Sequence, residues 1–157
     1  SIKGPKYRFV FVHRLVGGIG RDSRGGAIAA KLYEWGGSNT DGTLGLAQHR
    51  PGMELSIHQL LKKHGVQIVF HGHDHLYAKE EFDGIVYQEV PQPGQVGRGA
   101  ASEASSYGYD PSHVLGGSGF LKVSVGKGSA KLEFVRTSLF DPHGTVADTY
   151  SVAPNAR

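Results

Sequence analysis

VQIVFHGHDHLY, residues 66–77, is an apolar run that ends abruptly in three histidines, one glycine and one aspartate. A short unbroken apolar run of this kind is typical of a strand that is buried on both faces. We therefore predict that Val66–Phe70 is a buried strand, which delivers His73 and His75 to a cleft at its carboxyl end. On a strand, this spacing points both rings to one face, whereas on a tight turn the rings could aim at two adjacent metals.

A second apolar strand is predicted upstream, over Tyr7–His13, with the sequence YRFVFVH. It also ends in a histidine. A histidine at the carboxyl end of a buried strand stands where α/β proteins place groups that contact ligands. A half-buried histidine bonded to a neighbouring carbonyl group is the alternative reading of His13 alone.

Between the two strands, the segment Ser56–Gly65 has the pattern of a helix. Ser56 and Gln59 have the spacing of a capping box, and Gly65 suits the left-handed position after the last turn. A strand, a crossover helix and a strand form a βαβ unit, in which the two strands are parallel. Parallel strands end at the same edge of a sheet, so we expect His13 to lie beside the segment His71–His75.

The other residues of this segment have predicted supporting roles. Gly72 would let the backbone approach the site closely or adopt a positive φ. Asp74 would point away from the metal and either bond to loop backbone or orient an imidazole. His71 is interpreted as a structural or supporting residue, and direct ligation by His71 is the alternative.

The rest of the chain is predicted to be one domain, residues 1–157, with long loops over 14–52 and 91–118 and a β-rich C-terminal part. The expected elements are a short helix over Ala27–Trp35, a hairpin around Asp83-Gly84, a second hairpin around 126–128 and a last strand over Gly144–Val152. Loop residues that could meet an anionic substrate are Arg14, Arg21, Arg24, His49 and Arg50.

Composition limits the chemistry. The 157 residues include no cysteine, so a metal would have to be bound by histidine nitrogen and by carboxylate or amide oxygen. The net charge of +3 is mild, and no basic block resembles a nucleic-acid footprint. No run of about 18 apolar residues is present, so no transmembrane helix is predicted.

At this point the sequence resembles a known family. The motif Gly72-His73-Asp74-His75, together with a strand that ends in His13, resembles the C-terminal half of the calcineurin-like metallophosphoesterases. The similarity is to the purple-acid-phosphatase-like and bacterial phosphohydrolase branches, which favours an extracytoplasmic or periplasmic location.

The resemblance implies an α/β fold, namely the C-terminal half of a two-sheet metallophosphoesterase sandwich. It also implies two divalent metal ions (Zn, Mn, Fe or Ni) and a metal-bridging hydroxide that attacks phosphorus in a phosphoester substrate. Carried over to this chain, it assigns His13 and His73 to one metal and His75 to the other.

The sequence departs from the family in two ways. The motifs that supply the bridging carboxylate, the asparagine ligand and the acid histidine belong before the lone histidine, and the stretch preceding His13 contains none of them. Arg14 also stands where many members have a second histidine. We therefore expect the chain to be a fragment that lacks the N-terminal half of the domain, is inactive alone and binds at most one metal weakly. Its exposed strands could pair the chain with a second copy.

Two other functions are compatible with the same residues. The chain could be a non-catalytic binding module of the same descent, which keeps the sheet and has lost the chemistry. It could instead be a mononuclear metal-binding module, because three histidines with an open fourth position form a known catalytic zinc arrangement. The histidines could also lie near one another only by chance.

Overall fold

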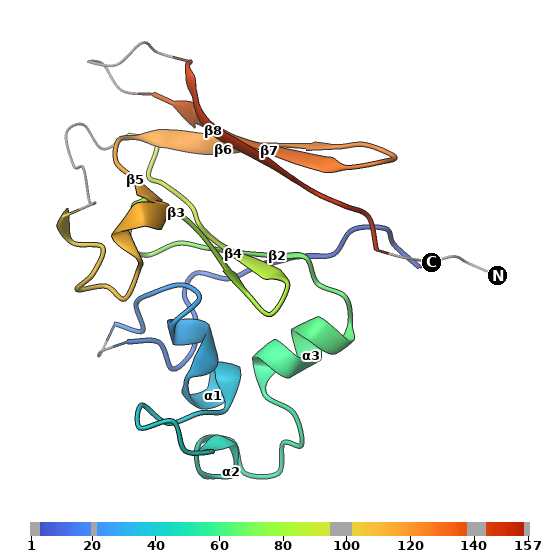
Figure 1. The fold of residues 1–157 in the computed structure, drawn as a ribbon, viewed down its shortest axis with the longest axis vertical. Coiled ribbons are helices and arrows are strands. Elements are labelled where there is room, and N and C mark those ends of the chain that lie inside the picture. The colour runs from blue at the N-terminus through green and yellow to red at the C-terminus, as the bar shows by residue number, and fades with distance from the viewer. Residues whose placement is uncertain (1–3, 20–21, 95–101, 138–143, 156–157) are drawn as a thin grey trace.

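The structure, a computed structural model, describes residues 4–19, 22–94, 102–137 and 144–155. The chain folds as a mixed α/β protein with a five-stranded sheet and a three-stranded sheet, rich in strands and poor in helices (Figure 1). The five-stranded sheet has the order β1-β2-β4-β3-β5, and its strands are β1 (Phe9–Phe11), β2 (Ile68–His71), β3 (Tyr77–Phe82), β4 (Ile85–Glu89) and β5 (Val114–Leu115). The three-stranded sheet consists of β6 (Gly119–Val125), β7 (Ala130–Arg136) and β8 (Val146–Val152).

The predicted parallel pair is confirmed. Strands β1 and β2 run parallel, with Phe9 opposite Ile68 and Phe11 opposite Phe70. The hairpin of β3 and β4 is also confirmed, and its turn residues Asp83 and Gly84 both have positive φ, of 53° and 83°. Two successive left-handed residues match the strand twist of a tight hairpin. Strand β4, and not β3, lies next to β2 and runs parallel to it.

Strand β2 is central because both of its faces are covered. The side chain of Val69 packs in a cluster with Leu15, Trp35 and Tyr87 on the helical side of the sheet. Its neighbours Ile68 and Phe70 point the opposite way and pack against Leu132 of β7. This alternation along one strand produces three layers, with the helices and the small sheet on opposite faces of the large sheet (Figure 1).

The described helices are short. Helices α1 (Tyr33–Gly36), α2 (Leu46–His49) and α3 (Ile57–Lys63) gather at one end of the molecule with the 3₁₀ turn η1 (Ala29–Lys31), whereas the 3₁₀ turn η3 (Pro111–His113) lies beside β3 and β5 (Figure 1). Helix α3 begins with the predicted capping box between Ser56 and Gln59. None of the helices in the described ranges is long and apolar enough to cross a membrane.

The prediction of one helix over Ala27–Trp35 is wrong. The segment forms η1 and α1, which are separated by Leu32 in an extended conformation, with φ −98° and ψ 154°. Leu32 forms a bridge with Ser38, so its backbone is committed to a small strand-like pairing instead of a helical turn. Apolar spacing alone could not reveal this competing partner.

The segment after β4 is packed where the structure describes it. Ala104 and Tyr109 are buried in a cluster with Leu76, Ala78 and Val114. Residues 95–101, inside the predicted 91–118 loop, lie outside the described residues. The C-terminal predictions are confirmed, because β6, β7 and β8 form consecutive antiparallel pairs.

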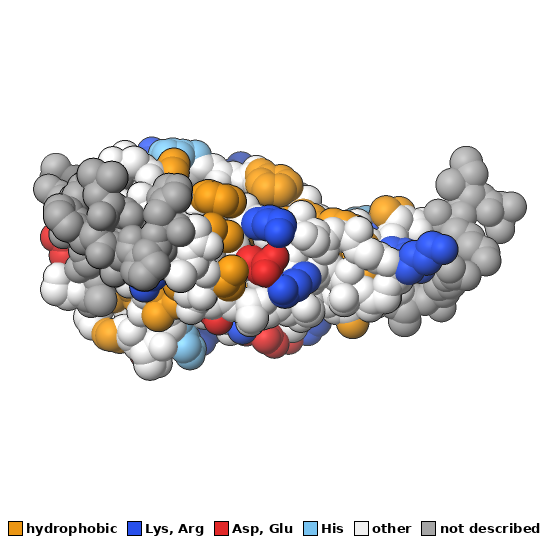
Figure 2. All heavy atoms as spheres, turned by 90° about the horizontal axis from the view of Figure 1, so that it is seen from above, with side chains coloured by type: hydrophobic (Ala, Val, Ile, Leu, Met, Phe, Trp, Pro, Cys, Tyr) orange, Lys and Arg blue, Asp and Glu red, His pale blue; other side chains and the backbone are white. Residues whose placement is uncertain are grey.

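One edge of the large sheet is open among the described residues. Strand β1 is its first strand and no described strand pairs with its outer side, and the side chain of Phe11 is 74% exposed. Parallel sheets normally have both faces covered, so a largely exposed phenylalanine on a parallel strand is unusual. The face of the molecule seen in Figure 2 is different in character, because small separate hydrophobic groups lie among charged side chains.

Candidate metal centre

Two of the predicted ligands meet at the carboxyl edge of the parallel pair. The backbone N–H of Val12 donates to the carbonyl oxygen of Phe70, and the N–H of Gly72 donates to the carbonyl oxygen of His13, both at 3.0 Å. The two chain segments therefore stay paired beyond the ends of β1 and β2. As a result, Nε2 of His13 lies 3.3 Å from Nδ1 of His73, with the two rings nearly perpendicular at 83°. The prediction that His13 would lie beside the histidine-rich segment is confirmed.

The separation of these two nitrogens suits a shared metal ion. Two nitrogens that are each about 2.0–2.1 Å from a tetrahedral zinc ion lie about 3.3 Å apart. The Nε2 atom of His73 is buried and has no hydrogen-bond partner among the described residues. His75 is exposed, and within the described ranges no group of three or more His, Asp or Glu residues could hold a metal ion. The structure thus brings two histidines, and not three, together at this edge.

The backbone around the pair has an unusual conformation. His73 and His75 both have positive φ, of 92° and 60°, although both are non-glycine residues. This conformation is uncommon outside glycine and is concentrated at functional sites. It follows β2 directly, so the rings are presented by a turn and not by continued strand alternation.

Of the two roles that we predicted for Gly72, close approach of the backbone to the site or a positive φ, the second is wrong. Its φ is not among the positive ones, and a Cβ atom placed on it would meet only the carbonyl oxygen of His13, at 3.8 Å. That distance is an ordinary van der Waals contact. The strained positions are therefore the two histidines, and something other than glycine must hold them.

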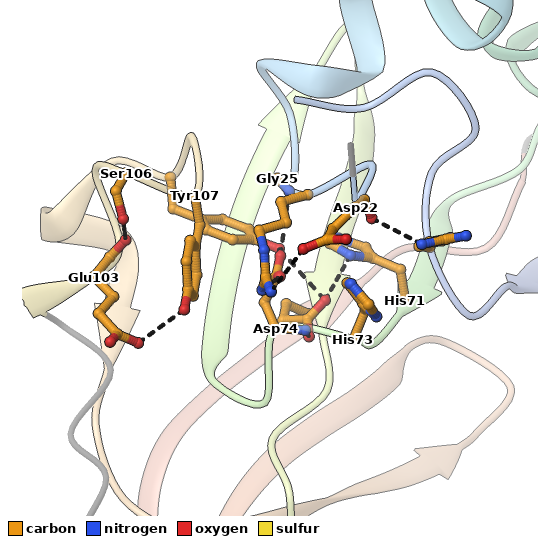
Figure 3. Close-up of polar contacts among 12 residues, drawn as sticks. Asp22, Gly25, His71, His73, Asp74, Glu103, Ser106 and Tyr107 are labelled. Carbon is orange, nitrogen blue, oxygen red and sulfur yellow. Dashed lines mark hydrogen bonds and ion pairs between the residues drawn. The ribbon is translucent and has the colours of Figure 1, made fainter. Parts of the chain in front are cut away.

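Asp74, between the two histidines, is buried and bonded on all sides (Figure 3). Its Oδ1 accepts from Nη1 of Arg24 at 2.5 Å, and its Oδ2 accepts from the N–H of Gly25 at 3.2 Å and from the Tyr109 hydroxyl at 2.8 Å. Its own N–H donates to Oε1 of Glu89 at 2.9 Å. The predicted bond of Asp74 to loop backbone is confirmed.

His71 forms a second buried contact. Its Nδ1 lies 2.7 Å from Oε2 of Glu89, and both side chains are almost fully buried. Burial raises the pKa of the Glu89 carboxyl group, and the contact with His71 opposes this rise. A buried carboxylate on one ring nitrogen fixes the ring orientation, as it does for many histidines at metal sites. The other nitrogen, Nε2, is buried without a partner among the described residues.

Glu80 joins the two long loops to the sheet. Its Oε2 accepts from the N–H of Ala27 at 2.7 Å, and its Oε1 accepts from the N–H of Asp110 at 2.9 Å. A Cβ atom on Gly26 would lie 2.5 Å from Oε2 of Glu80 and 3.0 Å from the Tyr109 ring, so only glycine fits there. The buried carboxylates Asp74, Glu80 and Glu89 are thus all used in holding the loops.

The predicted substrate-loop residues have mixed positions. Arg24 contacts Asp74 and lies over the Tyr107 ring, 4.2 Å from its centroid. Arg14 is exposed and donates to the carbonyl oxygen of Asp22 at 3.1 Å. His49, the last residue of α2, instead contacts Asn39, with 2.9 Å between Nε2 of His49 and Oδ1 of Asn39. Arg21 lies outside the described residues.

Sequence reasoning did not find Glu80, Glu89 or Tyr109. The available signal was weak, namely acidic residues in two strands that are otherwise rich in apolar residues. A buried carboxylate needs partners, and these partners come from loops that have no readable pattern.

No protein-family model matches the chain, and no curated protein is significantly similar to it. These comparisons place the chain in no family.

Proposed function

We propose that the chain is the C-terminal part of a metallophosphoesterase, a dinuclear-metal phosphoester hydrolase built as a two-sheet α/β sandwich. The observation that carries the proposal is the 3.3 Å separation of His13 and His73 at the carboxyl end of two parallel strands. These are the two histidines that the resemblance assigns to one metal.

Each residue has a specific role in this proposal. His13 and His73 hold one divalent ion, and His75, which follows Asp74 on the strained turn, contributes to its neighbour. Bound metals of this kind supply an activated water molecule and neutralise charge on the phosphate oxygens. Arg24 is ion-paired with Asp22 and Asp74, and through Asp74 it contacts the turn that carries His73 and His75.

The site needs ligands from another part of a complete domain. Three imidazoles cannot hold two cations close together against their repulsion, and the buried carboxylates near the site are bonded to backbone and side-chain donors. The open edge of β1 is adjacent to His13, and a strand added there would end beside this histidine. We infer that the N-terminal half of the domain docks on this edge and supplies the carboxylates.

A non-catalytic metal-binding module is the second candidate. It is favoured by the finding that no group of three His, Asp or Glu residues in the described ranges could hold a metal ion. In such a module, His13 and His73 would bind a metal ion weakly and catalyse no reaction.

Calorimetric titration of the purified chain with Zn²⁺ tests the metal site. We expect one weakly bound ion, lost in His13→Ala and in His73→Ala but retained in the control variant His113→Ala, whose histidine lies in η3. Absence of binding to the unaltered chain, or equal binding by the His13→Ala and unaltered chains, would contradict the proposed site.

A hydrolysis assay with p-nitrophenyl phosphate and bis-p-nitrophenyl phosphate tests the proposed division of the domain. The chain alone should show no metal-dependent activity, because the carboxylate ligands are supplied from outside it. Metal-dependent hydrolysis by the 157-residue chain would refute this division.

A further inference from the structure

We propose that Asp74 is a positioning residue, whose carboxylate holds the metal-binding turn in its left-handed conformation, and that Tyr109 and Arg24 act on the site through Asp74. This inference rests on the proposed metal site for its functional meaning. Its structural part can be tested without metal.

Asp74 is bonded at the centre of the strained turn. Asp74 lies between His73 and His75, the two non-glycine residues with positive φ in this turn. Four hydrogen bonds fix it, three to its carboxylate and one from its N–H. A strained conformation persists only when the surrounding structure determines it more than once, and these bonds meet that condition.

The groups that donate to Asp74 come from distant parts of the chain. Arg24 and Gly25 lie in the loop after β1, and Arg24 is 50 residues from Asp74 in the sequence. Tyr109 lies in the segment before η3, 35 residues from Asp74. Figure 3 shows Gly25 beside Asp74. The ring of Tyr109 also lies parallel to that of His71, with 6.4 Å between centroids. Two long loops therefore converge on one carboxylate.

The carboxylate of Asp74 acts only as a hydrogen-bond acceptor. Every group on the Asp74 carboxylate is a donor, namely a guanidinium, a backbone N–H and a hydroxyl. An asparagine side chain offers one acceptor oxygen and a donor NH₂ group. Whichever way the amide is turned, its NH₂ group must face one of these donors, so Asp74→Asn disrupts the contacts without changing the size of the side chain.

The consequence concerns His73. Release of the turn lets His73 and His75 return to ordinary φ values, which rotates both rings away from their present positions. The 3.3 Å approach of His73 to His13 is then lost. Side chains that support a metal site without binding the metal typically change its affinity by about 10- to 100-fold.

The sharpest test compares Tyr109→Phe with Tyr77→Phe. Both tyrosines are buried, and both donate a hydroxyl hydrogen to an aspartate, but Tyr77 bonds to Asp148 of β8 on the side facing the small sheet. Amide hydrogen exchange is measured first on the metal-free chains. We expect the Asp74 amide to exchange about tenfold faster in Tyr109→Phe, because its turn opens more often. The Tyr77→Phe chain should retain normal exchange at Asp74.

Titration with Co²⁺ supplies the functional readout. We expect Asp74→Asn to lower Co²⁺ affinity about tenfold and to shift the visible absorption of the bound ion, with a smaller loss in Tyr109→Phe and none in Tyr77→Phe.

The outcomes separate the two proposals. Normal exchange at Asp74 in Tyr109→Phe, or unchanged Co²⁺ affinity in Asp74→Asn, would overturn the positioning role. If the unaltered chain binds no Co²⁺ and exchange at Asp74 still rises selectively, the proposed metal function fails while the structural clamp stands.

Discussion

Removal of the Tyr87 hydroxyl should destabilise the protein strongly, because two buried polar groups depend on it. Trp35 Nε1–H donates to this oxygen at 2.9 Å, and Nδ1 of His58 lies 2.7 Å away. The indole can only donate, which leaves the hydroxyl hydrogen free for His58, and the lowered pKa of His58 favours the neutral ring, which accepts this hydrogen through Nδ1. One hydroxyl group is thus the hydrogen-bond partner of a buried side chain from α1 and of another from α3.

The expected loss of stability follows from the number of buried polar groups that Tyr87→Phe leaves without a hydrogen-bond partner. Each buried polar group left without a partner costs about 1–3 kcal/mol. Tyr87→Phe leaves two such groups in the helical layer of the core. We expect a loss of about 3 kcal/mol in the free energy of unfolding, and a fall in Tm of about 6–12 °C for a domain of this size.

Urea unfolding followed by circular dichroism measures the effect, with Tyr7→Phe as the matched control. The hydroxyl of Tyr7 is also buried but has no partner among the described residues. Removing it should leave stability unchanged or slightly higher, because no hydrogen bond is lost. A loss below about 1 kcal/mol in Tyr87→Phe, or equal losses in the two variants, would refute the inferred network.

Two other variants or conditions test separate features. Burial lowers the pKa of His58 in the folded protein, and Asp83 opposes this shift whereas Lys62 adds to it. As the pH falls, the imidazole of His58 is therefore protonated in the unfolded chain before it is protonated in the folded one. The free energy of unfolding should consequently fall as the pH drops below about 6.5 toward the lowered pKa. Urea midpoints at several pH values, with His58→Gln as control, should show a flatter dependence in the variant, and an identical dependence would exclude His58 as its source. Phe11→Lys on the open edge of β1 should change the free energy of unfolding by less than about 0.5 kcal/mol and reduce self-association in sedimentation velocity; a much larger loss would show that Phe11 belongs to the core.

The sequence by itself determined the local elements and their consequence at one edge. The apolar run before Gly72 and the capping box at Ser56 specify a strand and a helix through short-range interactions. Parallel pairing of β1 with β2 then follows from the crossover connection, and it brings His13 to His73. Local periodicity was enough to predict this much of the site.

Only the tertiary structure decided how the site is held. The left-handed conformation of His73 and His75 depends on Asp74, and the groups that bond to Asp74 come from loops without any local pattern. The placement of β4 beside β2 likewise depends on residues distant in the sequence. The break in the helical segment at Leu32 depends on the bridge to Ser38, which competes with a helical turn. Such partners are chosen by packing and by the need to satisfy buried polar groups. Periodicity and capping report only on the nearest few residues, so they could not reveal these choices.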